Sequence, residues 1–173
     1  MNTIIIYATK YGSTEKCASI LAKNLDGSVD IHNLKMNNDI DLSKYDKVII
    51  GSSIYIGQIR KEVKEFCENN LNELKNKKTG FYICCMHEGA EALSQIDNNF
   101  PKELLSNAIA KEHFGGEFSF DKMNFIEKFT VKMVSKKDDK KKPIDGKKNI
   151  SNLSEGRIKK FAQLMNNSGK KNI

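Results

Sequence analysis

Six consecutive residues near the N-terminus have the composition of an anion-binding turn: Thr9, Lys10, Tyr11, Gly12, Ser13 and Thr14. They follow an apolar run over residues 4–8 and precede a helical pattern over residues 14–25. A helix start presents free backbone N–H groups and the positive end of the helix dipole, which together favour an anion. Thr9, Ser13 and Thr14 add hydroxyl donors, and Gly12 lets the backbone approach closely. This first loop (residues 9–14) therefore predicts a site for a phosphate-bearing ligand.

Residue types exclude several classes of phosphate-using protein. A P-loop NTPase needs a lysine directly after its last glycine, followed by Ser or Thr, but Gly12-Ser13-Thr14 lacks that lysine. A dinucleotide site needs three spaced glycines, and the first loop has only Gly12. A phosphorelay receiver needs acidic residues at the ends of strands 1 and 3, but this chain has Ala8-Thr9 and Gly51-Ser52 there. A cysteine phosphatase needs a thiol in the first loop, and residues 9–14 contain no cysteine. What remains is a phosphate cradle without a reactive group.

Strand and helix patterns alternate along the chain. Strands are expected over residues 4–8, 29–34, 47–52, 80–86 and 110–116. Helices are expected over residues 14–25 and 63–74, from about Pro101 onward, and around Ile158, Phe161, Ala162 and Met165. Such alternation predicts an α/β fold with a parallel sheet covered by helices on both faces. We expect a three-layer doubly wound sandwich of strand order 2-1-3-4-5, formed as a single domain over residues 1–173, with an insertion over residues 118–150.

In this strand order, the loops after strands 1, 3 and 4 surround one crevice. The second loop contains Ser52, Ser53, Ile54, Tyr55, Ile56 and Gly57, and the third contains Met86, His87, Glu88, Gly89 and Ala90. The second loop (residues 52–58) is apolar and aromatic, which suits a flat ring tethered by a phosphate. Tyr55 is the expected stacking residue. We expect His87 and Glu88 to exchange protons or tune the ligand, unless they are ordinary polar loop residues.

The first loop resembles the T-x-x-G-x-T phosphate loop of the flavodoxin family. The resemblance covers nearly the whole chain and implies FMN, with its phosphate on residues 9–14. It places the isoalloxazine ring between residues 52–57 and the third loop (residues 86–90). The alternative for residues 9–14 is an ordinary capped helix start.

Residues 45–57, the pair Gly115-Gly116 and the insertion resemble more narrowly the menaquinone-dependent protoporphyrinogen IX dehydrogenase branch of that family. That branch has Arg-Tyr before the final glycine, where this chain has Tyr55-Ile56. The insertion is also poorer in aromatic residues. These departures leave a porphyrin substrate open while FMN remains implied.

The positive charge is concentrated in the insertion. The whole chain carries +7, and residues 132–148 contribute +5 through eight lysines and three aspartates. A helical stripe is predicted through Met123, Ile126, Phe129 or Thr130, and Met133 or Val134. One interpretation is a helix docked on the domain before a solvated loop; the other is a surface for an acidic partner or an anionic membrane, or a wall of the substrate site. No motif indicates nucleic-acid binding.

We expect a cytoplasmic protein, peripheral at most at the inner face of the membrane, because Met1 leads directly into a strand pattern too short for export. The four cysteines form no metal-binding pair and are expected to be buried thiols. The leading hypothesis is an FMN-dependent oxidoreductase that uses a redox protein or a quinone. The alternatives are a flavodoxin-type electron carrier and a non-catalytic flavin-binding or membrane-surface module.

Overall fold

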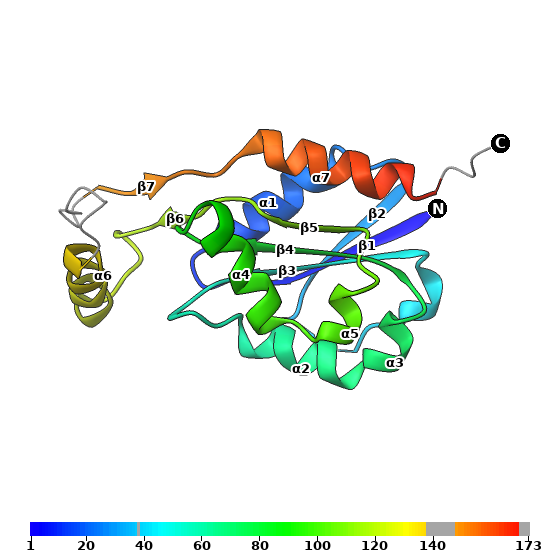
Figure 1. Cartoon of the computed structure of the whole chain (residues 1–173), viewed down its shortest axis with the longest axis horizontal. Helices are drawn as coiled ribbons and strands as arrows, with labels where there is room; N and C mark the ends of the chain where they lie inside the picture. The colour runs from blue at the N-terminus through cyan, green and yellow to red at the C-terminus, as the bar shows by residue number, and fades with distance from the viewer. Residues whose placement is uncertain (38, 138–147, 170–173) are drawn as a thin grey trace.

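A computed structural model describes residues 1–37, 39–137 and 148–169. Five parallel strands form one sheet in the order β2-β1-β3-β4-β5 (Figure 1). They are β1 (Asn2–Ala8), β2 (Ser28–Asn33), β3 (Lys47–Ser53), β4 (Lys78–Cys84) and β5 (Ala110–His113). Ala8 lies opposite Ser52, and Ser53 lies opposite Cys84. The first, second and third loops therefore leave the same edge of the sheet, and the predicted fold class and strand order are confirmed.

Burial along the strands follows from their place in the sheet. β3 is buried over its whole length, and β1 and β4 are buried except at their first residues, Asn2 and Lys78. β2, by contrast, is polar and largely exposed. The central strands are covered on both faces and therefore need continuous apolar runs, whereas an edge strand tolerates polar residues.

Helices cover both faces of the sheet (Figure 1). α1 (Ser13–Ala22) and α7 (Glu155–Asn167) pack on one face, where Cys17, Leu21 and Phe161 join the core. On the other face lie α2 (Lys61–Asn69), α3 (Leu71–Leu74), α4 (Gly89–Asn99), α5 (Lys102–Leu105) and the short 3-10 helix η1 (Leu42–Lys44). All four cysteines are free and buried, and the adjacent Cys84 and Cys85 belong to opposite cores, as predicted.

Helix α4 is absent from the sequence prediction. The third loop was expected to reach Ala90, but Gly89 and Ala90 already form the first turn of α4. Only Ala92 and Ile96 of this helix are buried, so its apolar face consists of two positions, too few for a clear helical period in the sequence. Pro101 precedes only the four-residue helix α5.

The insertion lies beyond the carboxyl ends of the strands (Figure 1). It contains α6 (Phe125–Lys137), and its two ends lie in β6 (Glu117–Phe118) and β7 (Ile150–Ser151), which pair antiparallel. Phe120 and Met123 are buried before the helix begins. Of the predicted helical stripe, Met123 is buried, whereas Ile126, Phe129 and Met133 are exposed, so the described part of α6 does not dock on the domain through that stripe. The side chains of Thr130 and Val134, and residues 138–147 of the lysine-rich run, lie outside the described residues.

Candidate functional site

The first loop is shaped by one glycine and one hydroxyl. Gly12 has φ 105°, a left-handed conformation that glycine adopts without strain. The Gly12 N–H donates to Thr9 Oγ1 at 3.0 Å, which folds the loop back on itself before α1 begins at Ser13. Within the described residues, the N–H groups of Ser13, Thr14 and Glu15 donate no hydrogen bond. The loop therefore presents three free donors at a helix N-terminus.

Buried hydroxyl groups surround these donors. Thr9, Ser13 and Thr14 are all buried, and so are the serines that end β3. Ser52 Oγ is already engaged, because it accepts from Arg60 N–H at 2.9 Å. Ser53 Oγ, in contrast, has no hydrogen-bond partner among the described residues. A buried hydroxyl without a partner costs stability unless a ligand or water completes it, so Ser53 points to a polar ligand at this edge.

The second loop makes a tight turn under backbone strain. Tyr55 and Gln58 exchange backbone hydrogen bonds of 2.9 and 3.1 Å. Between them Ile56 has φ 49° and Gly57 has φ 72°, the two positive φ values of a type I′ turn. A β-branched residue seldom adopts positive φ, and Ile56 is also 75% exposed. Strain of this kind clusters at ligand-binding sites.

The third loop is held by residues that sequence reasoning did not associate with it. Glu88 accepts from Arg157 Nη2 and from Asn152 Nδ2, both at 2.8 Å. Arg157 Nη1 also lies 3.2 Å from Nδ1 of the buried His113. Burial, and secondly the Arg157 guanidinium, lower the pKa of His113. Next to Glu88 in the chain, Nδ1 of His87 lies 2.8 Å from Oε1 of Glu91. Glu88 is thus held by two hydrogen bonds, whereas the contact from His87 to Glu91 is an ion pair only when His87 is protonated.

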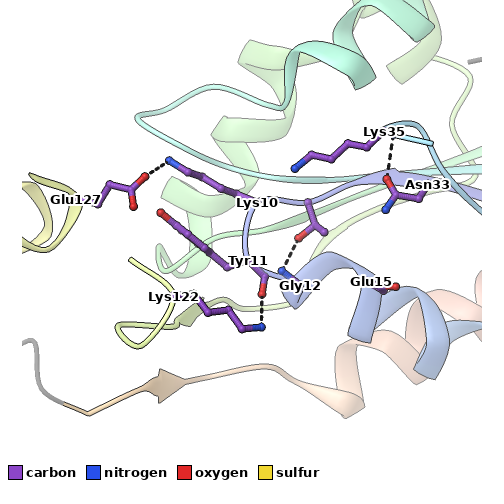
Figure 2. Close-up of a pocket in the computed structure, with 9 residues that line it drawn as sticks. Lys10, Tyr11, Gly12, Glu15, Asn33, Lys35, Lys122 and Glu127 are labelled. Atoms are coloured by element: carbon purple, nitrogen blue, oxygen red, sulfur yellow. Dashed lines mark hydrogen bonds and ion pairs between the residues drawn. The ribbon is translucent and has the colours of Figure 1, made fainter. Parts of the chain in front are cut away.

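A cluster of charged and aromatic side chains joins the insertion to the first two loops. Lys10 Nζ lies 2.5 Å from Glu127 Oε1 and 3.3 Å from the centroid of the Tyr55 ring. Figure 2 shows Lys10 and Glu127 pointing toward one another, and Lys122 donating to the backbone oxygen of Tyr11 at 3.2 Å. The Lys10 ammonium, and secondly the Asn124 N–H, lower the pKa of Glu127 to about 2.

A cavity of about 530 Å³ lies at this cluster (Figure 2). Its lining comprises Thr9, Lys10, Tyr11, Gly12, Glu15, Asn33, Lys35, Lys122 and Glu127. The second and third loops are not part of that lining. Residues 15, 33, 35, 122 and 127 were absent from the predicted site. Glu15 directly follows the first loop, and the other four are polar residues far from it in sequence.

Comparisons with known proteins agree with this architecture. Residues 4–145 match the family described as Flavodoxin domain. The chain belongs to the flavodoxin family. Over 144 residues it is 24% identical to the protoporphyrinogen IX dehydrogenase [quinone] of Escherichia coli strain K12. The aligned region covers 79% of this chain and 80% of that protein.

Solved flavodoxins share the fold of this flavodoxin-family chain. A Streptococcus pneumonia TIGR4 flavodoxin aligns with a TM-score of 0.57 and 18% identity, covering 95% of this chain and 97% of its own. The rubredoxin oxygen:oxidoreductase of Desulfovibrio gigas aligns with a TM-score of 0.52 and 20% identity over 66% of this chain. This chain spans only 30% of the length of that larger protein, so the likeness concerns one part of it.

As a member of the flavodoxin family, the chain is an FMN-binding, flavodoxin-like protein. The residues of the first and second loops fit FMN. The free N–H groups at the start of α1 suit its phosphate, and Ser53 offers a hydroxyl without a partner among the described residues. Within the described part of this flavodoxin-family chain, no helix has the length and apolar character needed to cross a membrane.

Proposed function

We propose that this flavodoxin-family protein dehydrogenates a reduced multi-ring substrate of the protoporphyrinogen class and delivers the electrons to a quinone. One observation carries the proposal. The insertion adds an apolar surface beside the flavin site, since Phe125 and Phe129 are 85% and 57% exposed on a helix tied to the first loop. Phe125, Phe129 and Met133 offer apolar surface to a large flat substrate and to a quinone. The name of the E. coli relative describes the same substrate and acceptor classes.

The proposed cofactor site uses the loops at the sheet edge. The N–H groups of residues 13–15 and the hydroxyls of Thr9, Ser13 and Thr14 hold the phosphate. Tyr55 provides a ring face, and Ser53 a hydroxyl, for the flavin ring between the second loop and residues 86–90. Bound FMN supplies the capacity to take up and release two electrons.

Each proposed turnover moves two electrons and two protons. The substrate loses them and is oxidised, and the quinone gains them and becomes a quinol. Among the residues of the third loop, His87 and Glu88 are the groups able to take or give protons, and Arg157 and Asn152 fix the orientation of Glu88.

An anionic membrane is the proposed location of this exchange, because quinones dissolve in lipid. The exposed apolar residues of α6, next to lysines such as Lys122 and Lys128, have the composition of an interfacial helix. Vesicles that contain anionic lipid should bind the protein at low salt and release it at high salt. Binding that ignores both lipid charge and salt would rule this location out.

The second candidate is an electron carrier that docks an acidic redox protein. The net charge of +7 favours it, because a basic surface attracts an acidic partner. The two functions differ in one assay. Anaerobic oxidation of protoporphyrinogen with a soluble quinone supports the dehydrogenase, whereas turnover only with a protein electron donor or acceptor supports the carrier.

The cofactor site is tested by FMN titration followed by visible absorbance. Wild-type protein should bind FMN stoichiometrically, and Ser13→Ala and Thr14→Val should each weaken binding about five- to fiftyfold, the cost of roughly one hydrogen bond to a charged group. Ser19→Ala is the matched control, because the Ser19 hydroxyl donates to Glu15 O within the same helix. Equal affinity of all variants would place the phosphate elsewhere.

A further inference from the structure

Three separate elements meet at the ammonium of Lys10. Lys10 belongs to the first loop, Tyr55 to the second loop and Glu127 to α6 of the insertion. The ion pair is shielded from water, with side-chain exposures of 24% for Lys10 and 15% for Glu127. The Lys61–Glu65 pair on α2 is far more exposed, at 83% and 48%. Shielding strengthens the attraction between charges, so the Lys10 pair is the stronger of the two.

Glu127 is also fixed on the insertion side. Its Oε2 accepts from the Asn124 N–H at 3.0 Å, and its own N–H donates to Asn124 Oδ1 at 2.9 Å. This reciprocal pair is the arrangement that caps a helix start. One carboxylate oxygen therefore orders the first turn of α6 while the other holds Lys10. Movement of the helix away from the first loop must break the contact to Lys10.

The charge of Lys10 is consequently balanced by a carboxylate. A lysine neutralised in this way contributes little to holding a phosphate dianion. The free N–H groups of residues 13–15 remain for the phosphate, as argued above. Lys10 thus joins the insertion to the flavin loops, a role different from the phosphate contact that its place in the first loop suggests.

We infer that Glu127 is a positioning residue, which acts through Lys10 and Tyr55 to hold the insertion closed over the FMN site. Closure limits the rate at which FMN enters and leaves, and it places the apolar residues of α6 beside the ring. The location of FMN rests on the proposed function, whereas the Glu127–Lys10 contact itself does not.

The first test measures the contact without FMN. In FMN-free protein, an amine-acylating reagent should label Lys10 several times more slowly than the exposed Lys61, because the Glu127 carboxylate holds the ammonium. Glu127→Gln keeps an oxygen for the Asn124 cap but removes the charge, and it should raise Lys10 labelling about three- to tenfold, the range for one partly shielded ion pair. Unchanged labelling at Lys10 would overturn the inference, whatever the protein does with FMN.

The second test measures FMN association and dissociation rates by stopped-flow fluorescence. Glu127→Gln should raise both rates about three- to tenfold and leave the dissociation constant within about threefold, because the insertion gates the site. Glu117→Gln is the matched control. It removes the same charge from β6 and breaks a 2.9 Å pair to Lys16 on α1 and a hydrogen bond from Ser151, but it leaves the contact between α6 and Lys10 in place. Its rates should stay within about twofold of wild type.

Other outcomes separate the two claims. If Glu127→Gln changes only the dissociation rate, and the dissociation constant in proportion, Glu127 belongs to the equilibrium contacts of FMN and the gating role is wrong. Equal changes of the rates in Glu127→Gln and Glu117→Gln would mean that the loss of any negative charge near the site has this effect, and the gating role of Glu127 would be wrong. If wild-type protein binds no FMN, the proposed function fails, and the labelling experiment alone decides whether Glu127 closes the insertion. A Lys10→Glu/Glu127→Lys exchange that restores protection of residue 127 would further support the contact.

Discussion

The insertion is attached to the domain at two places of very different construction. At its base, Gly116 and Asn152 exchange two hydrogen bonds, and Gly115 O accepts from Cys85 N–H at 3.0 Å. At its tip, an ion pair joins Lys10 to Glu127, and Lys122 donates a hydrogen bond to the backbone oxygen of Tyr11. The base is backbone packing around two buried glycines, whereas the tip is a partly shielded ion pair on a helix whose apolar residues are exposed. The base thus belongs to the fold, and the tip is a contact that the protein can open.

The base also reaches the third loop, which is part of the proposed flavin site. The amide of Asn152 joins Gly116 to Glu88, so that one side chain ties both strands of the insertion to the third loop. Disturbing the base should therefore change both stability and the site, while disturbing the tip should change the site alone.

Gly115→Ala should be the most destabilising change. Gly115 has φ 82°, and a Cβ there would lie 2.1 Å from the backbone oxygen of Asn152. Positive φ and overpacking together should lower the free energy of unfolding by about 2–4 kcal/mol, measured by urea denaturation. Gly57→Ala is the matched control, because Gly57 has φ 72° with nothing within 4 Å. It should cost only about 1 kcal/mol. Similar losses in both variants would show that the base is not tightly packed.

Asn152→Ala should have the next largest effect. It leaves Gly116 N–H and one Glu88 oxygen without their partner. The expected loss is about 1–3 kcal/mol, together with weaker FMN binding because the third loop is released. Asn76→Ala removes an exposed amide that bonds only within α3 and its flank, and it should change stability by less than about 0.5 kcal/mol. A stable Asn152→Ala protein with normal FMN affinity would separate the base from the site.

Arg157→Gln should act more on protonation than on stability. The Arg157–Glu88 pair is partly exposed, so its loss should cost only about 0.5–1 kcal/mol. The pKa of His113 should rise toward its ordinary value, since the neighbouring cation is gone, but burial should still hold it below that value. A lowered histidine pKa means that stability is full above the ordinary pKa and falls as the pH drops below it. Titration of His113 by NMR measures the shift, and an unchanged pKa would disconnect His113 from Arg157.

The sheet and the first loop could be predicted from sequence, but the tip of the insertion could not. Runs such as residues 47–52 are β-branched and continuous, and a strand followed by Gly12 and hydroxyl residues has few alternatives. Helix α4 was missed because only Ala92 and Ile96 face the core. The Lys10–Glu127 pair joins polar residues that no periodicity connects. Local patterns reveal elements, whereas a contact between charged side chains depends on how the finished elements are placed.

Acid titration of Glu127 should give the smallest effect and isolates the tip. Its pKa is lowered to about 2 by the Lys10 ammonium first and the Asn124 N–H second, so the carboxylate stays charged where ordinary glutamates are protonated. The stabilisation from this contact is therefore present above pH 4.5 and disappears as the pH falls through about 2. Lys10→Gln should move the pKa of Glu127 back toward 4.5, which carbon NMR of the carboxyl group measures. The midpoint of urea denaturation should change little. An unfolding midpoint that falls as far as in Asn152→Ala would mean that tip and base are one structural unit, and the insertion would then have no part free to open.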